Sequence, residues 1–278
     1  MHAIGIISLL IIVITTFFSS RGFADHSFFA RYCFEVEKIV IYKDYKRLIT
    51  AGLLHVNWGH LILNMLSFYF FSDALEAVLG PINFLVIYLA SLLGGNLLSL
   101  YIHRNHNAYS AVGASGAVCG IIFASVALFP GMQVSLFFFL PLPGWLYCIL
   151  FVLFSVYAIR SRRDNIGHDA HLGGALIGVI TALIMQPSAI LINYIPIALI
   201  IVPTLLFMFI IIRKPELLLV DNLFYKHQQN YTVDDRYNIS KRNRQEEIDR
   251  ILEKIHKKGM GSLTKKEKDM LKEFSKMK

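Results

Sequence analysis

The sequence predicts an all-α membrane protein, a polytopic bundle of about seven transmembrane helices with a small helical C-terminal tail. Of the 278 residues, 55% are hydrophobic and 17% are charged, and the mean hydropathy is +0.55. A soluble domain of this length carries more charge on its surface. The apolar residues also form segments of about 20 residues, the length that crosses a bilayer. The charges gather elsewhere, since 17 of the 27 Lys and Arg residues lie from Arg213 onward.

Seven apolar segments are expected to form the helices. No basic stretch precedes the first segment, so we interpret it as a retained transmembrane helix rather than as a signal peptide. The fifth is too long and is interrupted by Pro141 and Pro143, which predicts an interfacial stretch over 132–140 and a helix from about Trp145. The segments cover residues 4–20, 53–72, 82–102, 112–129, 133–159, 170–186 and 194–212.

Two regions lie outside these helices. The connection over residues 21–50 is rich in Phe, Tyr and Ile, so we expect it to fold against the bundle or to lie in the membrane interface. Residues 1–212 are predicted to be a transmembrane domain, and residues 213–278 a basic tail that ends in a helical hairpin at about 245–276. The net charge of +8 lies mostly in the tail (17 basic minus 11 acidic residues, +6), so it says little about nucleic acid and at most indicates an anionic membrane surface. No nucleic-acid partner is predicted, and the sequence does not identify the partner of the tail.

Polar residues inside the apolar segments indicate where function lies, because they are costly in a bilayer. His60 and Asn64, in the second segment, are four residues apart and therefore share one helix face. The fourth segment begins near Ser115 and the sixth near His171. Segments two, four and six run in the same direction, and each cluster lies in the first half of its segment. The three clusters are therefore predicted to meet at one depth below one membrane surface.

These residue types are typical of nucleophilic catalysis. A serine hydroxyl is a weak nucleophile until a neighbouring base takes its proton, so Ser115 is the predicted nucleophile and His171 the predicted general base. The tetrahedral intermediate needs hydrogen-bond donors for its oxyanion. We expect these from the side chains of His60 and Asn64 and from the backbone N–H groups of Ala114 and Ser115.

His168 is the alternative base. It is expected to face the membrane interface beside Asp169, whereas His171 lies just inside the apolar run. No cofactor or metal is predicted, because the three cysteines have no metal-site spacing and are expected to be small buried side chains. They are Cys33, Cys119 and Cys148.

The remaining polar residues are expected to be structural or solvated. His55 and Asn57 are expected to hydrogen-bond a loop or to support the catalytic residues. Glu76 is expected to be a helix cap or a loop anchor. His103 and His106 are expected to be solvated residues of a polar connection.

Taken together, the motifs resemble those of the rhomboid intramembrane proteases. They are Gly-Ala-Ser-Gly at 113–116, Ala-His-Leu-Gly-Gly at 170–174 and His-x-Asn-x-x-His-x-x-x-Asn at 55–64. The run Leu-Glu-Ala-Val-Leu-Gly at 75–80, expected after the second helix, resembles the family as well. One departure is Lys46 before Arg47, where the family often has Trp-Arg.

The resemblance covers about residues 45–186 and implies a six-helix core with an extra helix at about 194–212. It implies a serine endopeptidase that uses a Ser–His dyad on transmembrane protein substrates within the lipid bilayer. It also implies a multi-pass protein of a bacterial cell membrane.

Two questions stay open at this point. A catalytically silent relative that binds membrane clients, or a membrane acyl hydrolase, would also fit the apolar setting of Ser115. The orientation is ambiguous too. Within residues 1–212, Lys and Arg follow the first, third and fifth segments, which by the positive-inside rule places those connections and the tail in the cytoplasm. The resemblance implies the reverse for the active site.

Overall fold

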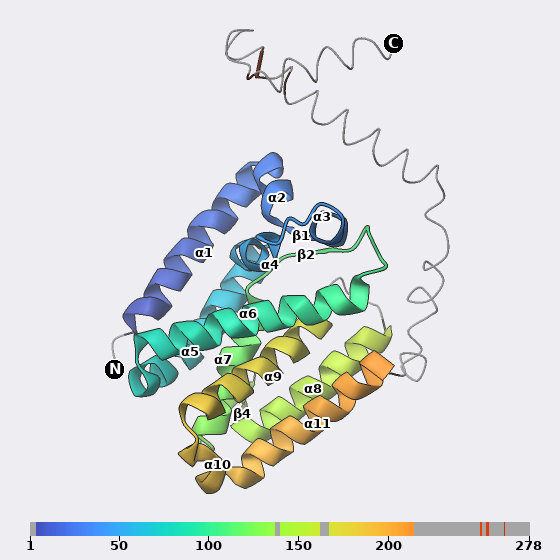
Figure 1. Cartoon of the computed structure of the whole chain (residues 1–278). Coiled ribbons are helices and arrows are strands. Elements are labelled where there is room, and N and C mark those ends of the chain that lie inside the picture. Colours follow the sequence, from blue (N-terminus) through green and yellow to red (C-terminus); the bar gives the residue numbers. More distant parts are fainter. Residues whose placement is uncertain are drawn as a thin grey trace. The chain divides into compact units, whose positions relative to one another are not determined.

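The computed structural model describes residues 4–136, 140–161 and 167–213, and residues 251, 254, 255 and 264 beyond them. In this part of the chain, five helices are long and apolar enough to cross a membrane (Figure 1). Two shorter apolar helices bring the number to the predicted seven. The long helices are α1 (Ile6–Ala24), α5 (Trp58–Leu79), α6 (Pro81–His103), α9 (His168–Met185) and α11 (Tyr194–Arg213), and the shorter ones are α7 (Ser115–Leu128) and α8 (Gly144–Ser161). The prediction of an all-α polytopic bundle is confirmed.

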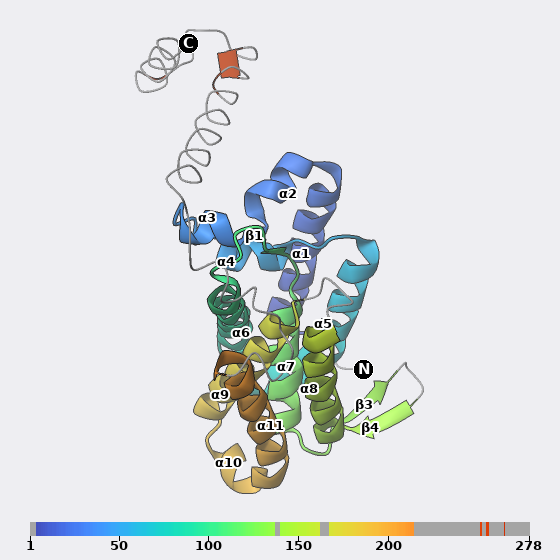
Figure 2. The same ribbon diagram turned by 90° about the vertical axis from the view of Figure 1, so that its right-hand side faces the viewer.

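Helix α7 is the centre of the bundle. All its residues from Gly116 to Ala127 are buried, and it contacts α5, α6, α8, α9 and α11 (Figures 1 and 2). It crosses α9 with backbone against backbone: a Cβ atom on Gly174 would collide with the Gly116 carbonyl, and one on Gly178 would lie 2.5 Å from the Cα of Gly120. The small residues on both helices permit this close approach.

Helix α1 is held by polar contacts instead. Apart from Ile11, its buried residues are small or polar, and its N-terminus is capped by a carboxylate from α5. The Glu76 side chain accepts hydrogen bonds from the backbone N–H groups of Ile7 and Ser8, each at 2.9 Å. The predicted anchoring role of Glu76 is confirmed, although its motif lies inside α5 and not after it. Helix α5 continues to Gly80, whose φ of 80° turns the chain into α6 at Pro81.

The start of α5 also differs from the predicted segment. The Asn57 side chain accepts a hydrogen bond from the backbone N–H of His60 at 2.8 Å and so caps the helix. His55 therefore precedes α5 and does not lie within it. This N-cap and the turn at Gly80 set the helix ends, so the helix is displaced toward the C-terminus relative to residues 53–72.

The connection between α1 and α5 folds against the bundle, as expected. It contains α2 (His26–Tyr32), β1 (Phe34–Glu35), α3 (Val36–Val40), α4 (Arg47–Thr50) and the 3-10 helix η1 (Ala51–Leu53). Strand β1 pairs antiparallel with β2 (Ser110–Ala111), in the segment that leads to α7.

Arg47 anchors this connection from within. The side chain is buried, and it donates to the carbonyls of Ala30 at 2.9 Å and Cys33 at 2.7 Å and to the Asp44 carboxylate at 3.0 Å. Lys46, where the sequence departs from the family pattern, is exposed and only pairs with Asp44 at 3.3 Å. The departure therefore leaves the anchoring contacts of Arg47 in place.

Between α7 and α8 the chain forms a β-hairpin that the sequence did not predict. Strands β3 (Gln133–Leu136) and β4 (Leu140–Pro143) pair antiparallel and lie beside α8 in Figure 2. Proline favours extended backbone for itself and for its preceding residue, which accounts for a strand rather than a helix before Gly144. Helix α8 then begins close to the predicted position.

A short helix, α10 (Ser188–Ile192), connects α9 to α11. At the start of α11 the Asn193 side chain donates to the carbonyls of Ala127 and Leu128, both at 3.1 Å, at the end of α7. These carbonyls would otherwise lack partners, so the seventh helix is tied directly to the central one. The predicted hairpin of the tail lies almost entirely outside the described residues.

Candidate active site

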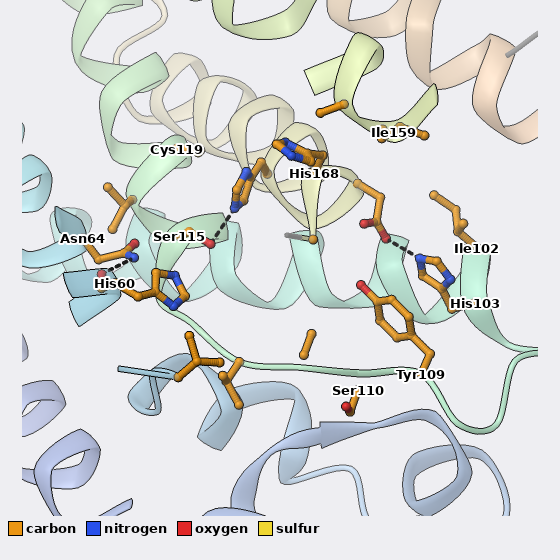
Figure 3. Close-up of a pocket in the computed structure, with 18 of the residues that line it drawn as sticks. His60, Asn64, Ile102, His103, Tyr109, Ser110, Ser115, Cys119, Ile159 and His168 are labelled. Carbon is orange, nitrogen blue, oxygen red and sulfur yellow. Dashed lines mark hydrogen bonds and ion pairs between the residues drawn. The ribbon is translucent and has the colours of Figure 1, made fainter. Parts of the chain in front are cut away.

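The structure brings Ser115 and His171 into direct contact. Nε2 of His171 lies 2.6 Å from Oγ of Ser115, and this contact is the dashed line at Ser115 in Figure 3. Ser115 is the first residue of α7, and His171 lies in the first turn of α9. The glycine-lined crossing of these helices makes such a short distance possible. The rings of Phe151 and His168 lie 6.1 and 5.5 Å from the His171 ring and partly enclose it.

Both residues line a cavity of about 1270 Å³ that also includes His60 and Asn64. In Figure 3, His60 and Asn64 lie on one side of Ser115 and His168 lies on the other. The starts of α5, α7 and α9 therefore meet at one end of the bundle. The sequence-based expectation that the three polar clusters converge is confirmed.

Gly113 sets the spacing between His60 and Ser115. Its φ of 138° is one that residues with a side chain rarely adopt. A Cβ atom there would lie 3.0 Å from the His60 ring and 3.5 Å from Oγ of Ser115. Glycine therefore leaves open the space between the proposed nucleophile and a proposed oxyanion donor.

Donors for an oxyanion are present on two sides of this space. The backbone N–H of Ser115 lies at the N-terminus of α7, where N–H groups have no partner within the helix and the helix dipole favours negative charge. Asn64 is buried and donates one amide hydrogen to the His60 carbonyl at 3.0 Å, which leaves its second hydrogen for another acceptor. His60 lines the same cavity.

The backbone N–H of Ala114, expected among these donors, points elsewhere. It donates to Nε2 of His55 at 3.4 Å, and Nδ1 of His55 lies 2.9 Å from the Ser19 hydroxyl. That hydroxyl also donates to the Leu53 carbonyl at 2.9 Å, so the consistent arrangement has the His55 proton on Nδ1. An oxyanion could use the Ala114 N–H only after this bond is broken.

His55 is fully buried, and it supports the loop before Ser115, as the sequence suggested. Burial, with a smaller contribution from the nearby His60, lowers the pKa of His55 to about 3. The ring is therefore neutral at physiological pH. A neutral ring keeps Nε2 as an acceptor for the Ala114 N–H, so its protonation would break this support.

The expectation that His168 faces the membrane interface is wrong. Only 4% of its surface is exposed, and its ring packs edge-on against Phe154 at 5.7 Å and against His171. In the first turn of α9, His168 packs toward α8. It is thus part of the wall around the proposed base.

The expectation that His103 is a solvated loop residue is also wrong. His103 is the last residue of α6, its ring stacks on Tyr109, and its Nε2 lies 3.3 Å from the Asp169 carboxylate. All three residues line the cavity. The sequence held one signal for this pair, a histidine at the end of one apolar helix and an aspartate in the first turn of another.

The chain is similar to known proteins over the region that holds these residues. The rhomboid domain model matches residues 42–188, more than half of the chain. A second model, for a family of unknown function (DUF6576), matches residues 231–277. The chain is similar to the RHOMBOID-like protein 12, mitochondrial, of Arabidopsis thaliana, with 33% identity over 48% of this chain and 44% of that protein.

It is also similar to the Rhomboid protein 1, mitochondrial, of Saccharomyces cerevisiae, with 32% identity over 51% of this chain and 43% of that protein. A third relative is the Rhomboid protease GluP of Bacillus subtilis, with 29% identity over 50% of this chain and 26% of that protein. The matched regions thus span less than half of each relative. Because the rhomboid domain model matches more than half of the chain, including Ser115 and His171, the chain belongs to the rhomboid family.

Proposed function

We propose that the chain is an intramembrane serine endopeptidase in which Ser115 is the nucleophile and His171 the general base. The observation that carries this proposal is the 2.6 Å contact between Nε2 of His171 and Oγ of Ser115. At this distance the imidazole can take the hydroxyl proton as Oγ attacks a peptide carbonyl, and can then return it to the leaving amine. The tautomer with its proton on Nδ1 leaves Nε2 ready for this transfer.

The Ser115 N–H, the Asn64 amide and the His60 ring are the proposed donors to the oxyanion. They come from α5 and α7, so a carbonyl carbon above Ser115 would have donors on both sides. Donors that are already in place need little reorganisation as charge develops, and each contributes about 10²–10³ in rate in other serine hydrolases. The Ala114 N–H is assigned to the support of the loop.

The proposed substrates are transmembrane segments of other membrane proteins. The dyad lies at one end of a bundle of apolar helices, so a substrate reaching it from the bilayer is itself apolar. A helix hides its peptide bonds, and the cleaved segment must therefore unwind locally. Small or helix-breaking residues near the cut favour this.

The relatives do not identify the membrane in which the chain resides. They include mitochondrial and chloroplast proteins as well as Bacillus proteins. The chain is a multi-pass membrane protein, and a bacterial cell membrane stays a prediction. So do the orientation and the side of the tail, which a reporter fused after Lys278 would determine.

The test uses the purified full chain in proteoliposomes with a fluorogenic transmembrane reporter peptide. Ser115→Ala and His171→Ala are each expected to lower kcat by about 10³-fold or more, because either change removes the activated nucleophile. Ser188→Ala, an exposed serine of α10 beyond the far end of α9, is the matched control and keeps wild-type activity.

Cleavage that persists in both variants would exclude the dyad. A parallel assay with an acyl ester in micelles separates the rival functions. Ester hydrolysis without peptide cleavage would indicate an acyl hydrolase. A wild-type chain without either activity would indicate a silent family member.

A further inference from the structure

A carboxylate–imidazole pair lies at the edge of the cavity, on the far side of the dyad from His60. Oδ2 of Asp169 and Nε2 of His103 are 3.3 Å apart, and their side chains are 8% and 19% exposed. The carboxylate is in the first turn of α9, where the helix dipole favours negative charge, and the imidazole is at the C-terminus of α6. The pair therefore links the ends of two helices of the core.

The carboxylate side of the pair belongs to the helical turn that holds the base. Asp169 is two residues before His171, and the carbonyl of the intervening Ala170 packs closely against two glycines. A Cβ atom added to Gly95 of α6 would collide with this carbonyl oxygen, and one added to Gly116 of α7 would lie 3.2 Å from it. The backbones of α6, α7 and α9 thus touch around this turn. A shift of its first residues changes the place of His171 directly.

The imidazole side of the pair reaches the segment that leads to the nucleophile. The His103 ring stacks face to face on Tyr109, with centroids 3.6 Å apart and planes at 7°. Tyr109 belongs to the connection from α6 to Ser115, and its carbonyl accepts the backbone N–H of Val36 at 3.1 Å. Figure 3 shows His103 and Tyr109 side by side, along the same cavity as Ser115.

We propose that Asp169 and His103 are positioning residues that fix the turn of the base against the segment of the nucleophile. This inference rests on the proposed Ser115–His171 dyad. Asp169 is not assigned a proton-transfer role, because its carboxylate pairs with His103. The pair is the functional unit, since a buried carboxylate that loses its partner becomes unfavourable where it stands and moves or takes a proton.

The test compares Asp169→Asn, His103→Gln and the double variant in the full chain, in proteoliposomes with the reporter peptide. Each single change is expected to lower kcat by about 10-fold with little change in KM, because a small displacement of the base affects the chemical step more than substrate binding. Labelling of Ser115 by a fluorophosphonate, which needs no transmembrane substrate, slows by a similar factor. The double variant is no slower than the slower single variant, because the two residues act as one unit.

The matched controls make the same chemical changes outside the cavity. They are Asp73→Asn in α5 and His26→Gln at the exposed start of α2, and both keep the wild-type kcat and labelling rate. All rates are expressed per folded protein, and the apparent melting temperature is measured in parallel. If Asp169→Asn does not fold, His103→Gln decides the question with the same two readouts.

Three results would overturn the proposal: an unchanged kcat and labelling rate, a lower melting temperature with full activity of the folded fraction, or losses that multiply in the double variant. The dyad is tested separately by Ser115→Ala. If that variant is inactive and Asp169→Asn behaves as wild type, only the positioning role fails. If Ser115→Ala still cleaves the reporter, the proposed function fails.

Discussion

The crossing of α7 and α9 and the docking of α1 onto α5 are built in opposite ways. At the first crossing, glycines remove side chains, so that two backbones touch and Ser115 meets His171. At the second, polar groups add to apolar contacts: Glu76 caps the start of α1, and Ser19 bonds His55 near its other end. The contact of the proposed dyad is therefore expected to be sensitive to added atoms, whereas the α1 contact is expected to be sensitive to removed charge or acceptors.

Between these two contacts, the largest effect is expected from adding one methyl group at the first crossing. In Gly174→Ala the new Cβ atom meets the backbone carbonyl of Gly116, which has no flexible end that could move aside. We expect a loss of about 3 kcal/mol in unfolding free energy and a kcat at least about 100-fold lower, because the helices must separate. The measurements are the apparent melting temperature and reporter cleavage per folded protein.

Gly131→Ala is the matched control, since a Cβ atom there meets nothing within 4 Å. It should keep wild-type stability and activity. A fully active Gly174→Ala variant would mean that the helices can separate without loss of the dyad. The expectation that the α7–α9 crossing is more sensitive to added atoms than the α1 contact would then be wrong for activity.

At the second contact, Glu76→Gln is expected to lower stability and to spare catalysis. The amide keeps one acceptor oxygen for two backbone N–H groups at the start of α1, and it removes a negative charge from the positive end of the helix dipole. The expected loss is about 2 kcal/mol, seen as a lower melting temperature, with kcat per folded protein unchanged. Glu37→Gln in α3 is the control.

An inactive Glu76→Gln variant with an unchanged melting temperature would contradict this view. It would place α1 within the machinery that positions the active site. The structure offers one route for such an effect, from Ser19 through His55 to the backbone of Ala114.

Much of the fold and of the site followed from the sequence, for a physical reason. Buried polarity is costly in a bilayer, so the few polar residues of apolar segments indicate function. Because the second, fourth and sixth segments run in the same direction, their polar residues His60, Ser115 and His171 were predicted to meet. The glycine crossing was also predictable, because small residues recur four apart on both helices.

Other features depended on local contacts that hydropathy does not report. The ends of α5 follow from the Asn57 cap and from the turn at Gly80, and both displaced the predicted segment. The partner of His103 is 66 residues further along the chain, so its burial followed only from the fold. The direction of the Ala114 N–H depended on a contact with His55 that no local pattern encodes.

The smallest expected effect is a pH dependence at the α1 contact. Burial holds the pKa of His55 at about 3 in the folded chain, against about 6.5 for an unperturbed histidine. Between these values the unfolded chain binds a proton that the folded chain does not, so stability falls as the pH falls through this range. From pH 7 to pH 5.5 the loss of unfolding free energy from this residue is about 1 kcal/mol.

We expect the melting temperature of His55→Gln to depend less on pH over this interval than that of the wild type. His26→Gln, which changes an exposed histidine, should keep the wild-type slope. Equal slopes for His55→Gln and the wild type would mean that His55 titrates alike in the folded and unfolded chains, and that its contacts with Ser19 and Ala114 do not depend on a neutral ring.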